Sequence, residues 1–144
     1  MGAEQNKVLV RRFIDEVFVK GNADAVDKLV THDFTPHSWG SVPAGIEPLK
    51  DAIWRVHAAL TDVSFKIEDI IAEEDRVAVR VTAHGRHTGE FMGMPASGRQ
   101  YAISETHIFH VRDGKVAEHW RDADMLGLMR QLGALPESND AKTR

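Results

Sequence analysis

Hydrophobic residues recur at helical spacing over the first 60 residues of the chain. In residues 7–20 the apolar positions share one helical face, and Gly21 supplies the left-handed cap that ends such a helix. Residues 23–30 predict a second, short helix, and residues 47–60 predict a third. The segment 32–45 lacks this periodicity, and we expect it to be irregular.

After residue 62 the apolar period falls from about 3.6 residues to 2, which is typical of strands with one buried face. The predicted strands begin at Val63, Val77, Arg99 and Lys115, and a closing helical segment covers residues 124–132. Glu74-Asp75 and Asp113-Gly114 mark two hairpin turns. Helices segregated on one face of an antiparallel sheet define an α+β fold. We predict a single domain over residues 1–135 and a disordered tail over residues 136–144.

Composition narrows the classes of function. The chain has 144 residues, of which 42% are hydrophobic and 28% charged, and its net charge of −4 offers no basic surface for nucleic acid or anionic lipid. It contains no cysteine and no apolar run long enough to cross a membrane, and residues 1–10 lack the charged start and long apolar stretch typical of a secretory signal. We therefore expect a cytoplasmic protein that acts on a small molecule. A long twisted sheet covered by three helices leaves a concave side where such a ligand can bind.

The last hairpin carries a dense set of ionisable residues. A type I turn with a G1 bulge at Gly114 is favoured, which pairs His110 with Val116. That register places one set of side chains on the cavity face: Thr106, Ile108, His110, Val116, Glu118, Trp120 and Asp122. His107 and His119 alternate with this set and are expected to face away. A two-residue turn is the alternative, and it would separate His110 from Trp120.

His110 and Asp124 are the candidate catalytic pair. A carboxylate near an imidazole fixes its tautomer, and a dry cavity raises the pKa of a carboxyl group, which suits general acid/base chemistry. The alternative for Asp124 is that it only caps the closing helix.

Other side chains are candidates for binding the substrate. They are His37, Trp39, Trp54, His57, Ile108, Glu118 and Trp120. For Trp120 and His57 the alternative is a structural place in the core, and for His37 an exposed place in a loop.

Familiar metal and nucleotide motifs are missing. The chain has no His-Glu-x-x-His, no Gly-x-Ser-x-Gly and no phosphate-binding glycine loop. His84 and His87 form a lone pair, so no metal is expected.

Three segments resemble the SnoaL-like family of polyketide cyclases and ester cyclases, within the nuclear-transport-factor-2-like superfamily. They are Gly85–Arg99, Asp113–Trp120 and Asp124–Gly133, and the resemblance spans about residues 5–135. It implies a cone-shaped α+β barrel, a homodimer that forms through the sheet, and no metal or organic cofactor. It also implies an acid/base aspartate at Asp124, assisted by a histidine fourteen residues earlier, a spacing that His110 keeps.

These observations support an enzyme that closes a ring by an intramolecular aldol reaction, or catalyses a related isomerisation, on a small hydrophobic carbonyl compound. Two alternatives stay open: a non-catalytic ligand-binding protein of the same fold, and a hydrolase or dehydratase that uses the same cavity.

Overall fold

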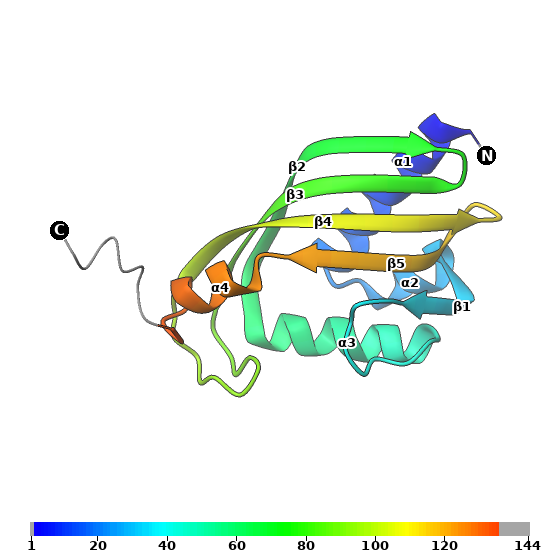
Figure 1. Cartoon of the computed structure of the whole chain (residues 1–144). Coiled ribbons are helices and arrows are strands. Elements are labelled where there is room, and N and C mark those ends of the chain that lie inside the picture. The colour runs from blue at the N-terminus through cyan, green and yellow to red at the C-terminus, as the bar shows by residue number, and fades with distance from the viewer. Residues whose placement is uncertain (1, 136–144) are drawn as a thin grey trace.

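The computed structural model describes residues 2–135 as four α-helices, one π-helical turn and five strands (Figure 1). The tail predicted over residues 136–144 lies outside the described residues. In chain order the elements are α1 (Ala3–Phe13), η1 (Ile14–Val19), α2 (Ala23–Leu29), β1 (Val30–Pro36), α3 (Ile46–Ala59), β2 (Leu60–Glu73), β3 (Arg76–His87), β4 (Gln100–Arg112), β5 (Lys115–Ala123) and α4 (Met125–Gln131).

The five strands form one curved sheet in the order β1-β5-β4-β3-β2, so the predicted α+β fold is confirmed. All neighbouring strands are antiparallel except β1, which pairs parallel to β5. Figure 1 shows α1, α2 and α3 on one side of the sheet, while the long strands curve toward α4 at the far end. The sheet therefore has an inner face toward the helices and an outer face toward solvent.

Period-2 alternation puts the apolar side chains of β3 on the inner face, where Val77, Val79 and Val81 are fully buried. They pack with Phe13 of the first helix and Phe109 of β4 in one core cluster. This core fills the end of the sheet nearest α1 and α2, and a second cluster around Tyr101 and Leu128 lies toward α4.

The expectation of an irregular segment over 32–45 is wrong at its start, because β1 runs to Pro36. This strand is short, ends in proline and lies at the sheet edge, where a missing N–H donor is tolerated. Thr35 and Pro36 lie beside Glu118 and His119 of β5, and the His37 amide donates to the His119 carbonyl at 2.8 Å.

The hairpin register predicted for β4 and β5 is also wrong. Arg112 pairs with Lys115, and Asp113 and Gly114 both have positive φ, at 52° and 74°, as a two-residue type I′ turn requires. The bulge lies instead in β5: Val111 faces Val116 and His110 faces Glu118, which leaves Ala117 as the extra residue. The bulge turns Val116 inward while Glu118 and Trp120 stay on the outer face with His110.

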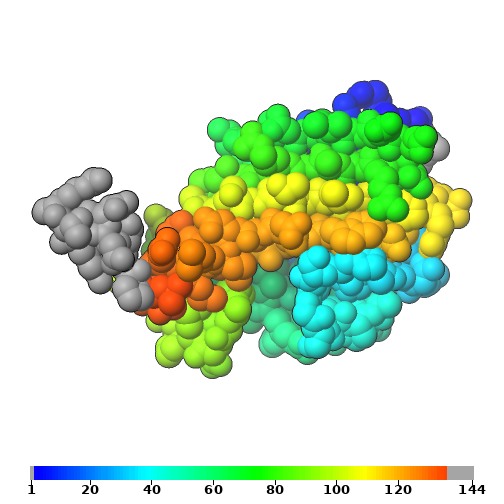
Figure 2. Space-filling model, in the orientation of Figure 1, coloured from blue at the N-terminus to red at the C-terminus, as the bar shows by residue number. Residues whose placement is uncertain are grey.

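None of the helices between residues 2 and 135 is long and apolar enough to cross a membrane. Figure 2 shows the outer face of the sheet and, below β5, a recess between the yellow-green β3–β4 loop and the cyan segment that follows β1.

Candidate active site

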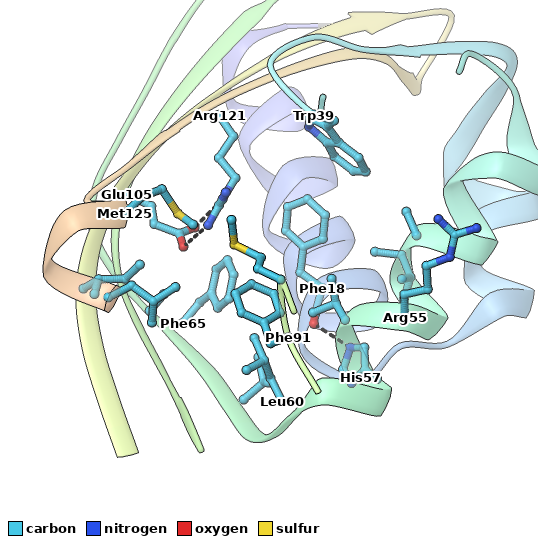
Figure 3. Close-up of a pocket in the computed structure, with 18 of the residues that line it drawn as sticks. Phe18, Trp39, Arg55, His57, Leu60, Phe65, Phe91, Glu105, Arg121 and Met125 are labelled. Atoms are coloured by element: carbon cyan, nitrogen blue, oxygen red, sulfur yellow. Dashed lines mark hydrogen bonds and ion pairs between the residues drawn. The ribbon is translucent and has the colours of Figure 1, made fainter. Parts of the chain in front are cut away.

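A cavity of about 420 Å³ lies between the inner face of the sheet, α3 and the β3–β4 loop (Figure 3). Most of its walls are aliphatic or aromatic. The apolar lining includes Phe18, Trp39, Ile53, Leu60, Phe65, Phe91, Ile103, Met125 and Leu128. A volume of this size, enclosed mainly by apolar groups, suits a small hydrophobic organic molecule.

One end of the cavity is polar, because β4 and β5 turn charged side chains inward there. Glu105 and His107 of β4 and Arg121 of β5 all line the cavity. His107 and Arg121 are direct cross-strand partners, so their side chains leave the sheet on the same face. His119, two residues before Arg121, shares that face and is completely buried.

Arg121 and Glu105 form an ion pair joined by two hydrogen bonds. Arg121 Nη2 lies 2.7 Å from Glu105 Oε2, and Arg121 Nε lies 3.2 Å from Oε1. The Glu105 side chain is 5% exposed and that of Arg121 34%, so the guanidinium is the part of the pair that the cavity can reach. Burial alone would raise the pKa of Glu105, but hydrogen bonds from His107 and Arg121 and the arginine charge lower it to about 2.

A row of hydrogen bonds continues from Glu105 into the protein. His107 Nε2 lies 2.8 Å from Glu105 Oε1, and His107 Nδ1 lies 2.8 Å from His119 Nε2. The indole Nε1–H of Trp39 then donates to His119 Nδ1 at 2.8 Å. Burial, followed by the charges of His107, Arg121 and His37, lowers the pKa of His119 well below its ordinary value.

Phe18, in the π-helical turn η1, holds this row in place. Its ring packs against His107, His119 and Trp39 at centroid distances of 5.7, 5.4 and 6.3 Å. His57 of α3 contacts the Phe18 carbonyl at 3.0 Å through Nε2, as the lower part of Figure 3 shows. Single π-helical turns occur often at functional sites.

Tyr101 adds a further donor to the lining. Burial and the Glu105 charge raise the pKa of Tyr101 to about 12, so its phenol keeps the proton at any physiological pH.

Of the predicted substrate-binding residues, the structure places Trp39 and His57 on the cavity wall. Their contact with a substrate stays a prediction. Trp54 also belongs to α3, but it is 73% exposed and does not line the cavity.

The predicted placement of His110 and Asp124 in the cavity is wrong. His110 lies on the outer face, where its Nε2 contacts Asp75 at 2.9 Å. Asp124 is exposed and caps α4, accepting a hydrogen bond from the Gly127 amide at 2.8 Å, which is the alternative given above. The two residues keep the fourteen-residue spacing, but neither reaches the cavity.

The other predicted binding residues of the hairpin also face outward. His37 stacks on Trp120 at 4.5 Å, and Glu118 lies 3.8 Å from His37. Ile108 is 39% exposed on the same surface. These residues form a cluster on the outer face of the sheet, where the bulge at Ala117 places Glu118 and Trp120 on the same side as His110.

The sequence prediction missed Glu105, His107, His119 and Arg121, and assigned both histidines to the wrong face. Two signals could have found them. In β4, Glu105 and His107 alternate in step with Tyr101 and the buried Phe109, which marks the inner face. His107 and Arg121 are also fourteen residues apart, so the spacing that suggested His110 and Asp124 fits this inner pair, with arginine in the second position.

Within residues 2–135, no group of three or more histidine, aspartate or glutamate side chains is arranged to hold a metal ion.

Fold and site together define a class: a small α+β protein whose curved sheet forms a ligand-sized cavity with an acid/base-capable end. Comparison with known sequences gives the family. The model of the SnoaL-like polyketide cyclase family matches residues 8–132, and the chain belongs to that family, as the resemblance predicted.

Characterised relatives and solved structures agree with this assignment. The chain is 32% identical over 130 residues to aklanonic acid methyl ester cyclase DauD of Streptomyces sp. strain C5, covering 87% of this chain and 80% of that protein. It is 27% identical over 120 residues to nogalonic acid methyl ester cyclase of Streptomyces nogalater, covering 81% and 89% of the two chains. The structure of TsrD from Streptomyces laurentii superposes with a TM-score of 0.85 at 32% identity, over 94% of this chain and 99% of that one.

Proposed function

We propose that this chain is a cofactor-free cyclase that closes a ring in a small hydrophobic polyketide by an intramolecular aldol reaction. The named activities of its relatives on aklanonic and nogalonic acid methyl esters support the substrate class. The observation that carries the proposal is the Arg121–Glu105 pair at the polar end of an otherwise apolar cavity.

In this proposal Glu105 is the base, since it is the one carboxylate among the described residues that line the cavity. Its Oε1 accepts from His107 and Arg121 and its Oε2 from Arg121, which leaves a lone pair on Oε2. A carboxylate whose pKa is about 2 is a weak base, and it suits a carbon acid flanked by two carbonyl groups.

Arg121 supplies the electrostatic stabilisation. A guanidinium has five N–H donors, and the two bonds to Glu105 leave others for a substrate oxygen. A donor fixed beside the carbonyl stabilises the negative charge that develops on the oxygen as the enolate forms.

The steps then balance without a co-reactant. The α-carbon gives its proton to Glu105 Oε2, and the resulting enolate carbon attacks a second carbonyl of the same molecule to form the new bond. The alkoxide that results takes the proton back from Glu105. The net reaction is an isomerisation.

Turnover of aklanonic acid methyl ester tests this proposal. Chromatography should show that the purified chain converts the ester to a ring-closed isomer of the same mass. Glu105→Gln should lose about 100-fold or more of the rate. Glu118→Gln, on the outer face, is the matched control and should keep the full rate. Full activity in Glu105→Gln would contradict the assignment of the base.

A non-catalytic ligand-binding protein is the second candidate, favoured by one observation: Glu105 is held by three hydrogen bonds and is strongly acidic. In that case the ester binds and raises the melting temperature, but its amount stays constant during prolonged incubation.

We also propose that two copies pair through the outer face of the sheet. Ile71, Ala78, Ile108 and Trp120 are successive cross-strand partners on β2 to β5 and form an apolar row across that face. Ile71 is 66% exposed. Sedimentation should report a dimer that Ile108→Asp dissociates.

The cytoplasmic location expected from the cysteine-free sequence stays a prediction.

A further inference from the structure

The row of hydrogen bonds behind Glu105 begins at a group that can only donate. The indole of Trp39 has one N–H and no acceptor, and it lies 2.8 Å from His119 Nδ1. His119 Nδ1 must therefore be the acceptor, without a proton. A histidine that accepts at one nitrogen is neutral and carries its single proton on the other, so His119 is protonated at Nε2 only.

The same logic fixes the next residue. His119 Nε2–H points at His107 Nδ1, 2.8 Å away, so His107 Nδ1 accepts. His107 then carries its proton on Nε2 and donates it to Glu105 Oε1 at 2.8 Å. The row ends at a carboxylate that also accepts from Arg121. Every hydrogen bond in the row is therefore donated in the same direction, from the Trp39 N–H, which can only donate, toward the Glu105 carboxylate, which can only accept.

The surroundings oppose any other charge state. His107 and His119 are 1% and 0% exposed. Three groups that carry or can take positive charge act on His119: His107 beside it, Arg121 on its own strand and His37 beyond the end of β1. The remaining close neighbours are the apolar rings of Phe18 and Phe109. A positive charge on His119 would be costly, because its hydrogen-bond partners within residues 2–135 are Trp39 and His107 and include no carboxylate.

We infer that Trp39 and His119 are positioning residues that hold His107 as a neutral imidazole protonated at Nε2. This inference deepens the proposed function, because it fixes the donor that orients Glu105. It also assigns a role to the segment between β1 and α3: this segment carries the N–H that requires His119 Nδ1 to accept. Neither histidine then serves as a charged acid toward the ligand.

Histidine ring nitrogens observed by ¹⁵N NMR on the whole chain test this inference, in the absence of substrate. At pH 7 the rings of His107 and His119 should each give one neutral form, protonated at Nε2. Because no turnover is measured, the result is independent of whether the chain is a cyclase. An imidazolium ring, or a proton on Nδ1 of either residue, overturns the inference.

Trp39→Phe removes the donor and keeps an aromatic ring. It frees His119 Nδ1 to carry the proton, so His119 should give a mixture of its two tautomers, while the Glu105 carboxylate keeps a proton on His107 Nε2. Trp54→Phe, at an exposed tryptophan of α3, is the control and should leave the spectrum unchanged. Unchanged tautomers in a folded Trp39→Phe chain would refute the role of Trp39.

Two variants of His119 keep the test decisive if Trp39→Phe fails to fold. Glutamine can accept from Trp39 through its oxygen and donate to His107 through its amide, so His119→Gln should keep His107 protonated at Nε2. His119→Leu can do neither, so the ¹⁵N signal of His107 Nδ1 should shift as that nitrogen loses its hydrogen bond, while Nε2 keeps its proton beside Glu105. Identical His107 signals in the two variants would also overturn the inference.

Discussion

Arg121 and His107 are cross-strand partners, and both donate hydrogen bonds to the same carboxylate, Glu105. Two neighbouring strands therefore supply all the contacts that keep this buried carboxyl group ionised. The helices contribute the walls of the cavity and the rings that pack behind it.

Removing Arg121 should change the acidity of Glu105. In Arg121→Met the guanidinium charge and two hydrogen bonds are lost while burial and the His107 hydrogen bond remain, so the pKa of Glu105 should rise from about 2 toward its ordinary value of 4.5. The carboxyl carbon of Glu105, followed by ¹³C NMR against pH, measures this change. Arg76→Met removes a guanidinium from the outer face, where it lies 5.0 Å from the Trp120 ring, and should leave the titration unaltered.

The same carboxyl group should make folding stability depend on pH. Its folded pKa lies below the value of 4.5 for a free glutamate, so its stabilisation is complete above about pH 5 and is lost as the pH falls toward 2. The loss amounts to about 3 kcal/mol in the free energy of unfolding. Urea unfolding between pH 5 and pH 2.5 should show a smaller decline in Glu105→Gln, which no longer titrates there. Equal declines in both proteins would contradict the ion pair.

Asp124 should matter for stability and not for turnover. Its carboxylate caps α4, so Asp124→Ala should lower the free energy of unfolding by about 1 kcal/mol. Asp124→Asn keeps a capping side chain and should be close to neutral. Both variants should retain the wild-type rate in the ring-closure assay. A large loss of rate in a folded Asp124→Asn protein would restore the role that the spacing first suggested.

The β3–β4 loop depends on a glycine where it meets the end of α3. The amides of Thr88 and Gly89 both donate to the Ala59 carbonyl at 3.0 Å, and a Cβ on Gly89 would overlap the Ala58 carbonyl oxygen. Gly89→Ala should therefore displace the loop that carries Phe91 and raise KM more than it lowers kcat. It should also cost about 1–3 kcal/mol of stability. Glu90→Ala, at an exposed position in the same loop, is the control and should change neither quantity.

Much of the fold could be predicted from the sequence, because the signals for it are local. The stripe around Ile53 predicted α3 to within one residue at each end, and Asp113-Gly114 predicted the turn between β4 and β5. Strand β1 was missed because its pairing with β5 joins segments about 85 residues apart and leaves no alternation within the strand.

The site was harder to predict, because it depends on which face of a strand is the inner one. Glu105, His107 and Arg121 are polar residues at buried or cavity-facing positions, so the alternation of polar and apolar residues weakens where the site lies. Ile108 was assigned to the cavity face together with His110, but it is 39% exposed on the outer face. The hydrogen bond between Trp39 and His119 joins residues 80 positions apart, and no local sequence pattern predicts it.

The bulge at Ala117 has a consequence for comparing this chain with its relatives. The bulge gives β5 one more residue than the β4 segment opposite it. The number of residues between the turn and a given site position in β5 is therefore one larger than in a hairpin without the bulge. An alignment that ignores the extra residue would match His119 and Arg121 with outward-facing positions of a regular hairpin, and Glu118 and Trp120 with inward-facing ones. For a relative whose hairpin lacks the bulge, transfer of site residues therefore requires a gap at Ala117 before any position in β5 is matched.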